Sequence, residues 1–381
     1  MIKSFIYKII KNILKIILKF NFIKIRKKKI TFISYPDLSD NSWHLFNYIH
    51  QNRNNLRLIW LLNENISKRK KNSIIEINKT NKLLFIKKKS LMGVYHFLSS
   101  RIVFFTHNTY FFSQKNIGPI LVNLWHGMPI KKVGFYRHKK PVNFYFDFMI
   151  STSNLYQKVL SKAFNLKKRS IIQCGLPRND ILVNKKKIFF NQKNLKLVLW
   201  LPTFRNTSGF EKIHDSPKQH FLEEWPVNFI SKLNEIATFN KILVLIKTHP
   251  LDVFKKSNKK YSNIIFLKNN DLIKMKLDIH ELISNSDGLL SDVSSVIIDY
   301  ILMEKPVGLT TNFLKDFKRG LIKELNFFSN LKYQNIRNLK DFEIFFKRVK
   351  KKQKMIIDPK NIFYSKNAIN ASIKITKYFN I

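Results

Sequence analysis

The chain alternates between short apolar runs and segments whose apolar residues recur every three or four positions. The short runs predict buried strands and the longer spacing predicts helices. Strands separated by helices imply parallel sheets covered on both faces. The predicted strands are 30–34, 56–62, 83–86, 102–106, 121–125, 148–151, 171–173, 197–201, 242–247, 264–266 and 288–290, with another beginning at Pro306. The predicted helices are 42–50, 91–98, 155–163, 227–237, 279–285 and 296–301.

The length of the chain and one lysine-rich stretch divide this alternating pattern into two parts. A chain of 381 residues exceeds what one hydrophobic core usually accommodates. The lysines between residues 185 and 196 interrupt the alternation. We therefore predict two Rossmann-like α/β domains with a cleft between them, over residues 30–190 and 191–335. Basic terminal helices are expected over residues 336–381.

Residues 1–29 form a separate basic segment, in which residues 2–20 predict an amphipathic helix. One face carries Ile6, Ile9, Ile10, Ile13, Ile17 and Phe20, and the opposite face carries Lys8, Lys11, Lys15 and Lys19. Three central lysines would cost about 2.5–3.5 kcal/mol each in a bilayer, more than the apolar side chains return at about 0.3–0.6 kcal/mol each. We therefore expect docking on an anionic cytoplasmic membrane surface, helped by Arg26–Lys29. The alternative is a helix that packs on its own domain.

The composition favours anionic partners and a reducing compartment. The net charge is +46, from 70 Lys and Arg against 24 Asp and Glu, which suits nucleic acid, acidic lipid or phosphorylated substrates. No nucleic-acid-binding module is recognisable, so nucleic acid is not expected as a partner. The single cysteine, Cys174, excludes an internal disulfide framework. Neither a zinc-type Cys/His spacing nor an Asp-x-Asp pair is present, so we expect no metal and no cofactor.

His126 is the first candidate catalytic residue. It follows the predicted strand 121–125 and precedes Gly127. A side chain at the carboxyl end of a parallel strand points toward the crevice where α/β sheets bind ligands. An imidazole titrates near neutrality and can take a proton from an alcohol, and Gly127 leaves room for a substrate. The alternative is a structural histidine held by hydrogen bonds.

The second half of the chain places cationic and hydroxyl side chains after successive predicted strands. Arg205 follows strand 197–201, and Thr248 with His249 follows strand 242–247. A guanidinium can form two hydrogen bonds to a phosphate. Asp292, Ser294 and Ser295 lie where a turn becomes a helix, which suits either ordinary N-caps or a phosphate seat at the positive helix end. Together these residues predict a site for a diphosphate held without a metal.

Arg178, Asn179 and Asp180 form a third candidate group near the predicted domain boundary. They follow Gly175-Leu-Pro177, a turn-forming sequence. We expect them either to close over the ligand in the cleft or, for Asp180, to cap the next helix.

Several of these motifs resemble those of the CDP-glycerol glycerophosphotransferases of teichoic-acid and capsule synthesis. The resemblance covers roughly residues 30–310 and rests on the order and spacing of its motifs. They are Asn123–Gly134, Gly175–Asp180, Leu201–Arg205, Thr248–Pro250 and Ser291–Ser295 with Asp299, and the weaker Ser39–Ser42 and Thr106–Asn108. The chain departs from the family at Val293, usually Tyr, and at Phe204, often Trp. Neither departure removes a charge or a proton carrier.

The resemblance implies a GT-B fold, with the nucleotide bound by the C-terminal half and the acceptor reached through the N-terminal half. It implies catalytic roles for His126 and His249, and contacts from Arg205, Ser294 and Ser295 to the donor diphosphate. The expected reaction moves an alditol phosphate, most directly glycerol phosphate, from a CDP-alditol to a hydroxyl of a membrane-linked or polysaccharide acceptor and releases CMP. One alternative is a GT-B glycosyltransferase that uses a nucleotide sugar. A more distant alternative is a non-catalytic protein that binds polyanions.

Overall fold

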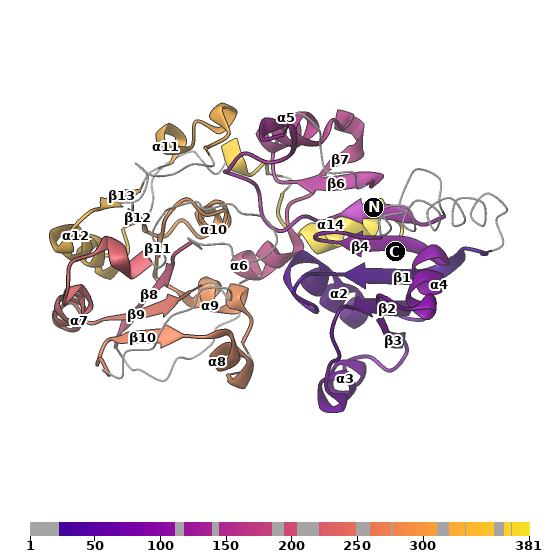
Figure 1. Ribbon diagram of the computed structural model, residues 1–381, viewed down its shortest axis with the longest axis horizontal. Helices are drawn as coiled ribbons and strands as arrows, with labels where there is room; N and C mark the ends of the chain where they lie inside the picture. Colours follow the sequence, from indigo (N-terminus) through magenta and orange to yellow (C-terminus); the bar gives the residue numbers. More distant parts are fainter. Residues whose placement is uncertain are drawn as a thin grey trace, which may run out of the picture. The chain divides into compact units, whose positions relative to one another are not determined.

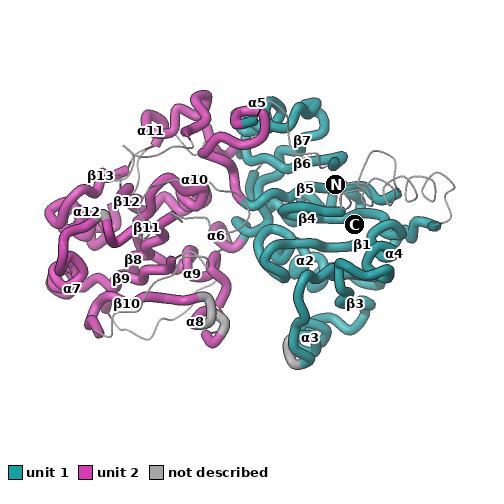
Figure 2. The backbone as a smooth tube through the Cα atoms, viewed as in Figure 1, with its two compact units in different colours: residues 1–126, 138–180, 365–381 teal, residues 127–137, 181–364 magenta. Residues whose placement is uncertain are grey.

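The chain folds into two compact α/β units, each built on its own parallel sheet (Figures 1 and 2). Unit 1 comprises residues 1–126, 138–180 and 365–381, and unit 2 comprises residues 127–137 and 181–364. The computed structural model describes residues 23–110, 118–138, 145–184, 194–203, 221–248, 260–275, 277–310, 320–331, 333–353, 362–366 and 368–381. The predicted amphipathic helix over residues 2–20 lies outside these ranges and stays a prediction.

Unit 1 is a seven-stranded parallel sheet in the order β3-β2-β1-β4-β5-β6-β7. The strands are β1 (Arg26–Ile33), β2 (Arg57–Leu62), β3 (Lys82–Lys87), β4 (Ser100–Phe105), β5 (Ile120–Asn123), β6 (Phe148–Ser151) and β7 (Ile171–Gln173). The described α-helices are α2 (Asp40–Asn52), α3 (Lys68–Ile75), α4 (Leu91–Leu98), α5 (Asn154–Phe164) and α14 (Ala371–Tyr378). Large aromatic side chains fill the space between α2 and the sheet, where Phe32 stacks on Trp60 and Phe104.

Unit 2 is a six-stranded parallel sheet in the order β10-β9-β8-β11-β12-β13. The strands are β8 (Lys196–Leu201), β9 (Ile242–Lys247), β10 (Ile264–Leu267), β11 (Gly288–Ser291), β12 (Val307–Thr310) and β13 (Gln334–Ile336). The described α-helices are α6 (Asp180–Asn184, which begins in unit 1), α7 (Phe229–Phe239), α8 (Asn269–Lys274), α9 (Ile279–Asn285), α10 (Val296–Tyr300), α11 (Phe327–Asn330) and α12 (Leu339–Lys350). Trp200 packs among Phe221, Trp225, Phe229 and Phe342 in the core that β8 shares with α7 and α12.

The predicted strands and the parallel α/β architecture are confirmed, but the chain is divided between the units differently from the predicted boundary at residue 190. Unit 1 ends at Asp180 and regains the chain at residue 365. Residues 127–137 belong to unit 2, because Lys131 pairs with Leu321 in an antiparallel bridge and the Lys132 N–H donates to Gly320 at 3.1 Å. Of the described helices after residue 336, α12 therefore packs in unit 2 and α14 in unit 1.

Candidate active site

The turn after β5 exposes His126 and buries the residues on both sides of it. Residues 121–125 and 127–130 are buried, whereas His126 is exposed. Trp125 and Gly127 both have left-handed backbone angles, with φ of 52° and 114°. Gly127 takes this conformation at little steric cost, whereas Trp125 is strained in it. The backbone thus turns sharply around one imidazole at the carboxyl end of a parallel strand.

The orientation of the His126 ring is set by the end of the neighbouring strand β4. Its Nδ1 atom lies 3.4 Å from the carbonyl oxygen of Thr106, a long hydrogen bond. A carbonyl only accepts, so this contact favours the tautomer with the proton on Nδ1 and the lone pair on Nε2. The ring also stacks on Trp125 and on His107, each with ring centroids 4.4 Å apart. This tautomer leaves Nε2 as the basic atom.

Asn41 and Arg178 hold the backbone of this turn from two other elements of unit 1. The Asn41 amide group donates to the carbonyl oxygens of Leu124 and Trp125, both at 3.0 Å, and its oxygen accepts from the Arg178 N–H at 3.1 Å. Nη1 of Arg178 donates to the His126 carbonyl at 3.1 Å and to Asp40 at 3.0 Å. These contacts give Arg178 a role in fixing the turn, and its predicted closure over a ligand stays a prediction.

Asp180 caps the last helix of the chain. Its two carboxylate oxygens accept from the backbone N–H groups of Ala371 at 2.7 Å and Ser372 at 2.9 Å, at the start of α14. Burial raises the pKa of Asp180, and these hydrogen bonds partly offset the rise. The sequence favoured either a ligand contact or a cap on the next helix, but the helix that Asp180 caps lies far along the chain. The adjacent Asn179 is buried.

In unit 2, Asp292 joins two neighbouring strands at their carboxyl ends. Both of its carboxylate oxygens accept from the Thr203 N–H, at 2.9 and 3.1 Å, and the residue is 1% exposed. Ser291 donates from its hydroxyl to the Leu201 carbonyl at 2.6 Å, which strengthens the same junction between β8 and β11. The described contacts of Asp292 are therefore structural, and its predicted contact with the donor stays a prediction.

The other predicted donor-binding residues of unit 2 lie at the carboxyl ends of adjacent strands. Thr248 follows β9, and Ser294 with Ser295 follows β11; all three are half-buried. Ser295 is the N-cap of α10, but its side chain makes no capping hydrogen bond. The ordinary N-cap role is thus absent at Ser295. Arg205 and His249 lie outside the described residues, so their roles stay predictions.

Lys247, at the end of β9, is a cation that the sequence reasoning missed. Burial lowers the pKa of its ammonium group to about 8, against the opposing effect of the Asp278 carboxylate. Its Nζ atom lies 3.4 Å from the Thr248 carbonyl. Its only sequence signal is its position beside Thr248, since a single lysine in a chain with 70 Lys and Arg is not distinctive.

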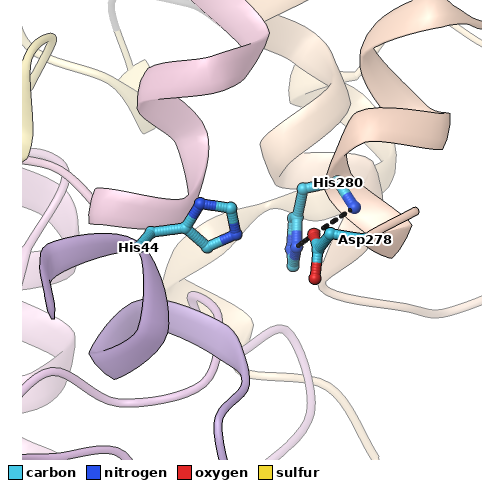
Figure 3. Close-up of side chains that lie close together, drawn as sticks. All are labelled: His44, Asp278 and His280. Atoms are coloured by element: carbon cyan, nitrogen blue, oxygen red, sulfur yellow. Dashed lines mark hydrogen bonds and ion pairs between the residues drawn. The ribbon is translucent and has the colours of Figure 1, made fainter. Parts of the chain in front are cut away.

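The acidic and histidine side chains at the start of α9 act as a helix cap. Asp278 accepts from the His280 N–H at 2.7 Å and lies 2.9 Å from its Nδ1 atom (Figure 3), and with Glu281 it completes a capping box. His44, drawn in the same figure, belongs to α2 of the other unit. Among the described residues, neither unit by itself contains three metal-ligating side chains in one group.

The chain is similar in sequence to curated enzymes of teichoic acid synthesis. The chain is 24% identical over 329 residues to a teichoic acid poly(glycerol phosphate) polymerase of Bacillus spizizenii, covering 77% of each chain. It is 24% identical to a teichoic acid ribitol-phosphate primase of the same organism, and the match covers 62% of each chain. It is 23% identical to a teichoic acid poly(glycerol phosphate) polymerase of Staphylococcus epidermidis, and that match covers 42% of the polymerase.

Solved structures of the wall teichoic acid polymerase TagF share the fold. One matches with a TM-score of 0.73 at 18% identity and covers 100% of this chain and 95% of that one. Another, of a variant soaked with CDPG, matches with a TM-score of 0.74 at 19% identity and covers 97% of this chain and 93% of that one. The GT-B-like fold implied by the sequence is therefore confirmed. The family model for CDP-glycerol:poly(glycerophosphate) glycerophosphotransferase matches residues 16–366, so the chain belongs to that family.

Proposed function

We propose that this protein transfers an alditol phosphate from a CDP-alditol to a hydroxyl group of a membrane-linked or polysaccharide acceptor and releases CMP. The product would be a polymer of the teichoic-acid or capsule type. The family assignment supports this reaction class. The observation that carries the proposal is the exposed imidazole of His126 at the end of β5, with Nδ1 turned toward the Thr106 carbonyl.

The reaction requires one proton transfer and one displacement at phosphorus. Nε2 of His126 takes the proton of the acceptor hydroxyl, whose oxygen attacks the phosphorus that bears the alditol. A new phosphate ester bond forms as the bond from that phosphorus to the bridging oxygen breaks, and CMP leaves with the electron pair. CMP is a good leaving group, so positioning and neutralisation of charge supply most of the catalysis.

The donor diphosphate is assigned to the strand ends of unit 2. Ser294 and Ser295 offer hydroxyl groups after β11, and Thr248 offers one after β9. Arg205 and His249 would neutralise the charge that develops on the leaving phosphate. Lys247, at the end of β9, adds a positive charge at the same edge of the sheet. Glycerol phosphate is the first choice of transferred group, and ribitol phosphate is the second because one relative is a ribitol-phosphate primase.

Release of CMP from CDP-glycerol and CDP-ribitol tests the reaction, with a panel of UDP- and GDP-sugars as negative donors. His126→Ala should lower kcat by about 10²–10⁴-fold while binding of the CDP-alditol survives, because a general base is lost. His138→Ala is the matched control, since His138 is an exposed histidine of the same unit. Undiminished turnover in His126→Ala would remove that residue from the mechanism. The proposed reaction would be overturned if neither CDP-glycerol nor CDP-ribitol yielded CMP.

The protein is proposed to act at the cytoplasmic face of the membrane as a peripheral protein. Support comes from the basic residues 2–29, in which apolar and lysine side chains segregate on a helical projection. Among the helices that the structure describes, none has the length and apolar character needed to cross a bilayer. Co-sedimentation with vesicles of anionic and of zwitterionic lipid tests this placement. Equal binding to both, or to neither, would contradict it.

A further inference from the structure

His107 lies against the proposed base and is not used by the reaction as described so far. It follows Thr106 at the end of β4. Its ring stacks on that of His126, with centroids 4.4 Å apart and planes inclined by 15°. Tyr35 meets the His107 ring edge to face at 5.9 Å. The sequence singled out this histidine only as part of the weak echo Thr106–Asn108.

Thr106 connects the two imidazoles. Its hydroxyl oxygen lies 2.9 Å from Nδ1 of His107, and its carbonyl oxygen lies 3.4 Å from Nδ1 of His126. One residue at the end of β4 thus sets the orientation of both rings. An exposed histidine without such contacts samples several rotamers about its two side-chain torsions.

Burial is the main reason that the His107 ring is neutral. Burial, followed by the effects of His126 and Lys88, lowers the pKa of His107 to about 3, whereas Asp40 acts in the opposite direction. His107 is therefore uncharged at neutral pH. When His126 accepts a proton, the ring stacked on it is a neutral aromatic face and adds no like charge that would oppose the transfer.

We propose that His107 is a positioning residue that fixes the plane of the His126 imidazole by ring stacking, so that Nε2 faces the acceptor hydroxyl. This inference deepens the proposed function and rests on His126 being its base. A restrained base matters because proton transfer requires a heavy-atom separation near hydrogen-bonding distance, and small misplacements reduce the rate steeply.

Three variants test the stacking role by steady-state kinetics of CMP release. His107→Ala should lower kcat by about 10- to 100-fold, as expected for a misplaced base, and leave KM for the CDP-alditol within about twofold. His107→Phe retains a flat neutral ring and should recover most of the lost kcat. His138→Ala serves as the control that leaves both constants unchanged. Thermal melting of each variant separates loss of function from loss of fold.

The proposal is overturned if His107→Ala keeps the wild-type kcat, or if His107→Phe is as slow as His107→Ala in a folded protein. The second result would mean that a polar atom of His107, and not its ring face, is required. A readout independent of turnover is the ¹⁵N spectrum of the His126 ring. We expect mostly the Nδ1–H tautomer in the wild type and in His107→Phe, and a tautomer mixture in His107→Ala. If no CDP-alditol is turned over, the proposed function fails, and these spectra still decide whether stacking fixes the ring.

Discussion

Replacing Lys29 tests how unit 1 tolerates a buried cation whose charged neighbours in the described part of the chain are also cations. Lys29 lies on β1 and is 1% exposed. Its ammonium group donates to the Ser99 hydroxyl at 2.5 Å and lies 4.9 Å from the centre of the Tyr95 ring. Its other charged neighbours are Arg57 and Arg26, and no acidic residue precedes it in the sequence. Burial, followed by these two guanidinium groups, lowers the pKa of Lys29 from 10.5 to about 7.

The magnitude follows from the difference between the folded and unfolded states. The pKa falls from 10.5 to about 7 on folding. At about 1.4 kcal/mol per pKa unit, this difference corresponds to about 5 kcal/mol that the fold must supply when Lys29 is charged. Between about pH 7 and pH 10 the unfolded chain binds the proton and the folded protein does not. The free energy of unfolding therefore rises with pH through this window, by about 1.4 kcal/mol per unit, and this contribution is flat below it.

Lys29→Met removes the charge and keeps an unbranched apolar side chain. At pH 7 the variant should be more stable than the wild type by about 3–4 kcal/mol, after about 1 kcal/mol is allowed for the lost hydrogen bond to Ser99. The difference should shrink to about 1 kcal/mol or less at pH 9. Denaturant unfolding of the full chain at several pH values measures it, with the exposed Lys28→Met as the matched control. A stability difference that is independent of pH, or a variant less stable than the wild type at pH 7, would refute the reasoning.

Three further substitutions probe the contacts around the candidate site. Arg178→Met removes one donor from Asp40 and one from the His126 carbonyl. It should lower the free energy of unfolding by about 3 kcal/mol, measured by denaturant, and reduce kcat in the CMP assay. Asp180→Ala removes the cap of α14 and should lower the free energy of unfolding by about 1–2 kcal/mol. Faster amide exchange in residues 371–376 would show that the loss is local. Gly175→Ala places a Cβ atom 2.2 Å from the Ala368 carbonyl oxygen at a φ of +90°, so it should lower the thermal midpoint more than Asp180→Ala does.

The alternating architecture was predictable from the sequence because strands of a parallel sheet are buried on both faces. Runs such as residues 242–247 contain apolar side chains on consecutive positions, which few other structures require. The elements that were missed lack this signal. Strand β13 is only three residues, Gln334–Ile336, and is polar at two of them. Helix α3 (Lys68–Ile75) is mostly lysine, arginine and asparagine, so no apolar stripe marks it.

The candidate site was predictable only as far as its chemistry follows from local sequence. His126 could be singled out from local sequence alone, because the strand before it and the turn around it are both visible there. The contacts of Asn41 and Asp180 depend on partners that lie 83 or more positions away in the chain. No local pattern distinguishes an aspartate that caps a distant helix from one that faces a ligand. A stacked pair such as His107 and His126 is equally hidden, because it depends on the order β4-β5 in the sheet.

The acidic residues of unit 1 are few, and most of them accept hydrogen bonds within the unit. The sequence of unit 1 contains only Asp37, Asp40, Glu64, Glu76, Asp147 and Asp180. Asp37 accepts from the backbone of Asn63 and Glu64, and Asp147 from that of Leu121. The lysines and arginines of this unit far outnumber its six carboxylates, so the unit carries a net positive charge and a long-range positive field.

A polyanionic acceptor should be attracted by this field, and a neutral acceptor analogue should not. KM for a phosphate-bearing acceptor should rise by about tenfold as the ionic strength increases from about 0.05 to 0.3 M, because the screening length falls to several ångströms. KM for a neutral hydroxyl acceptor should change by less than about twofold, since it carries no charge to be screened. Equal salt dependence for both acceptors would show that the positive surface acts elsewhere, and the charge of unit 1 would then have no part in choosing the acceptor.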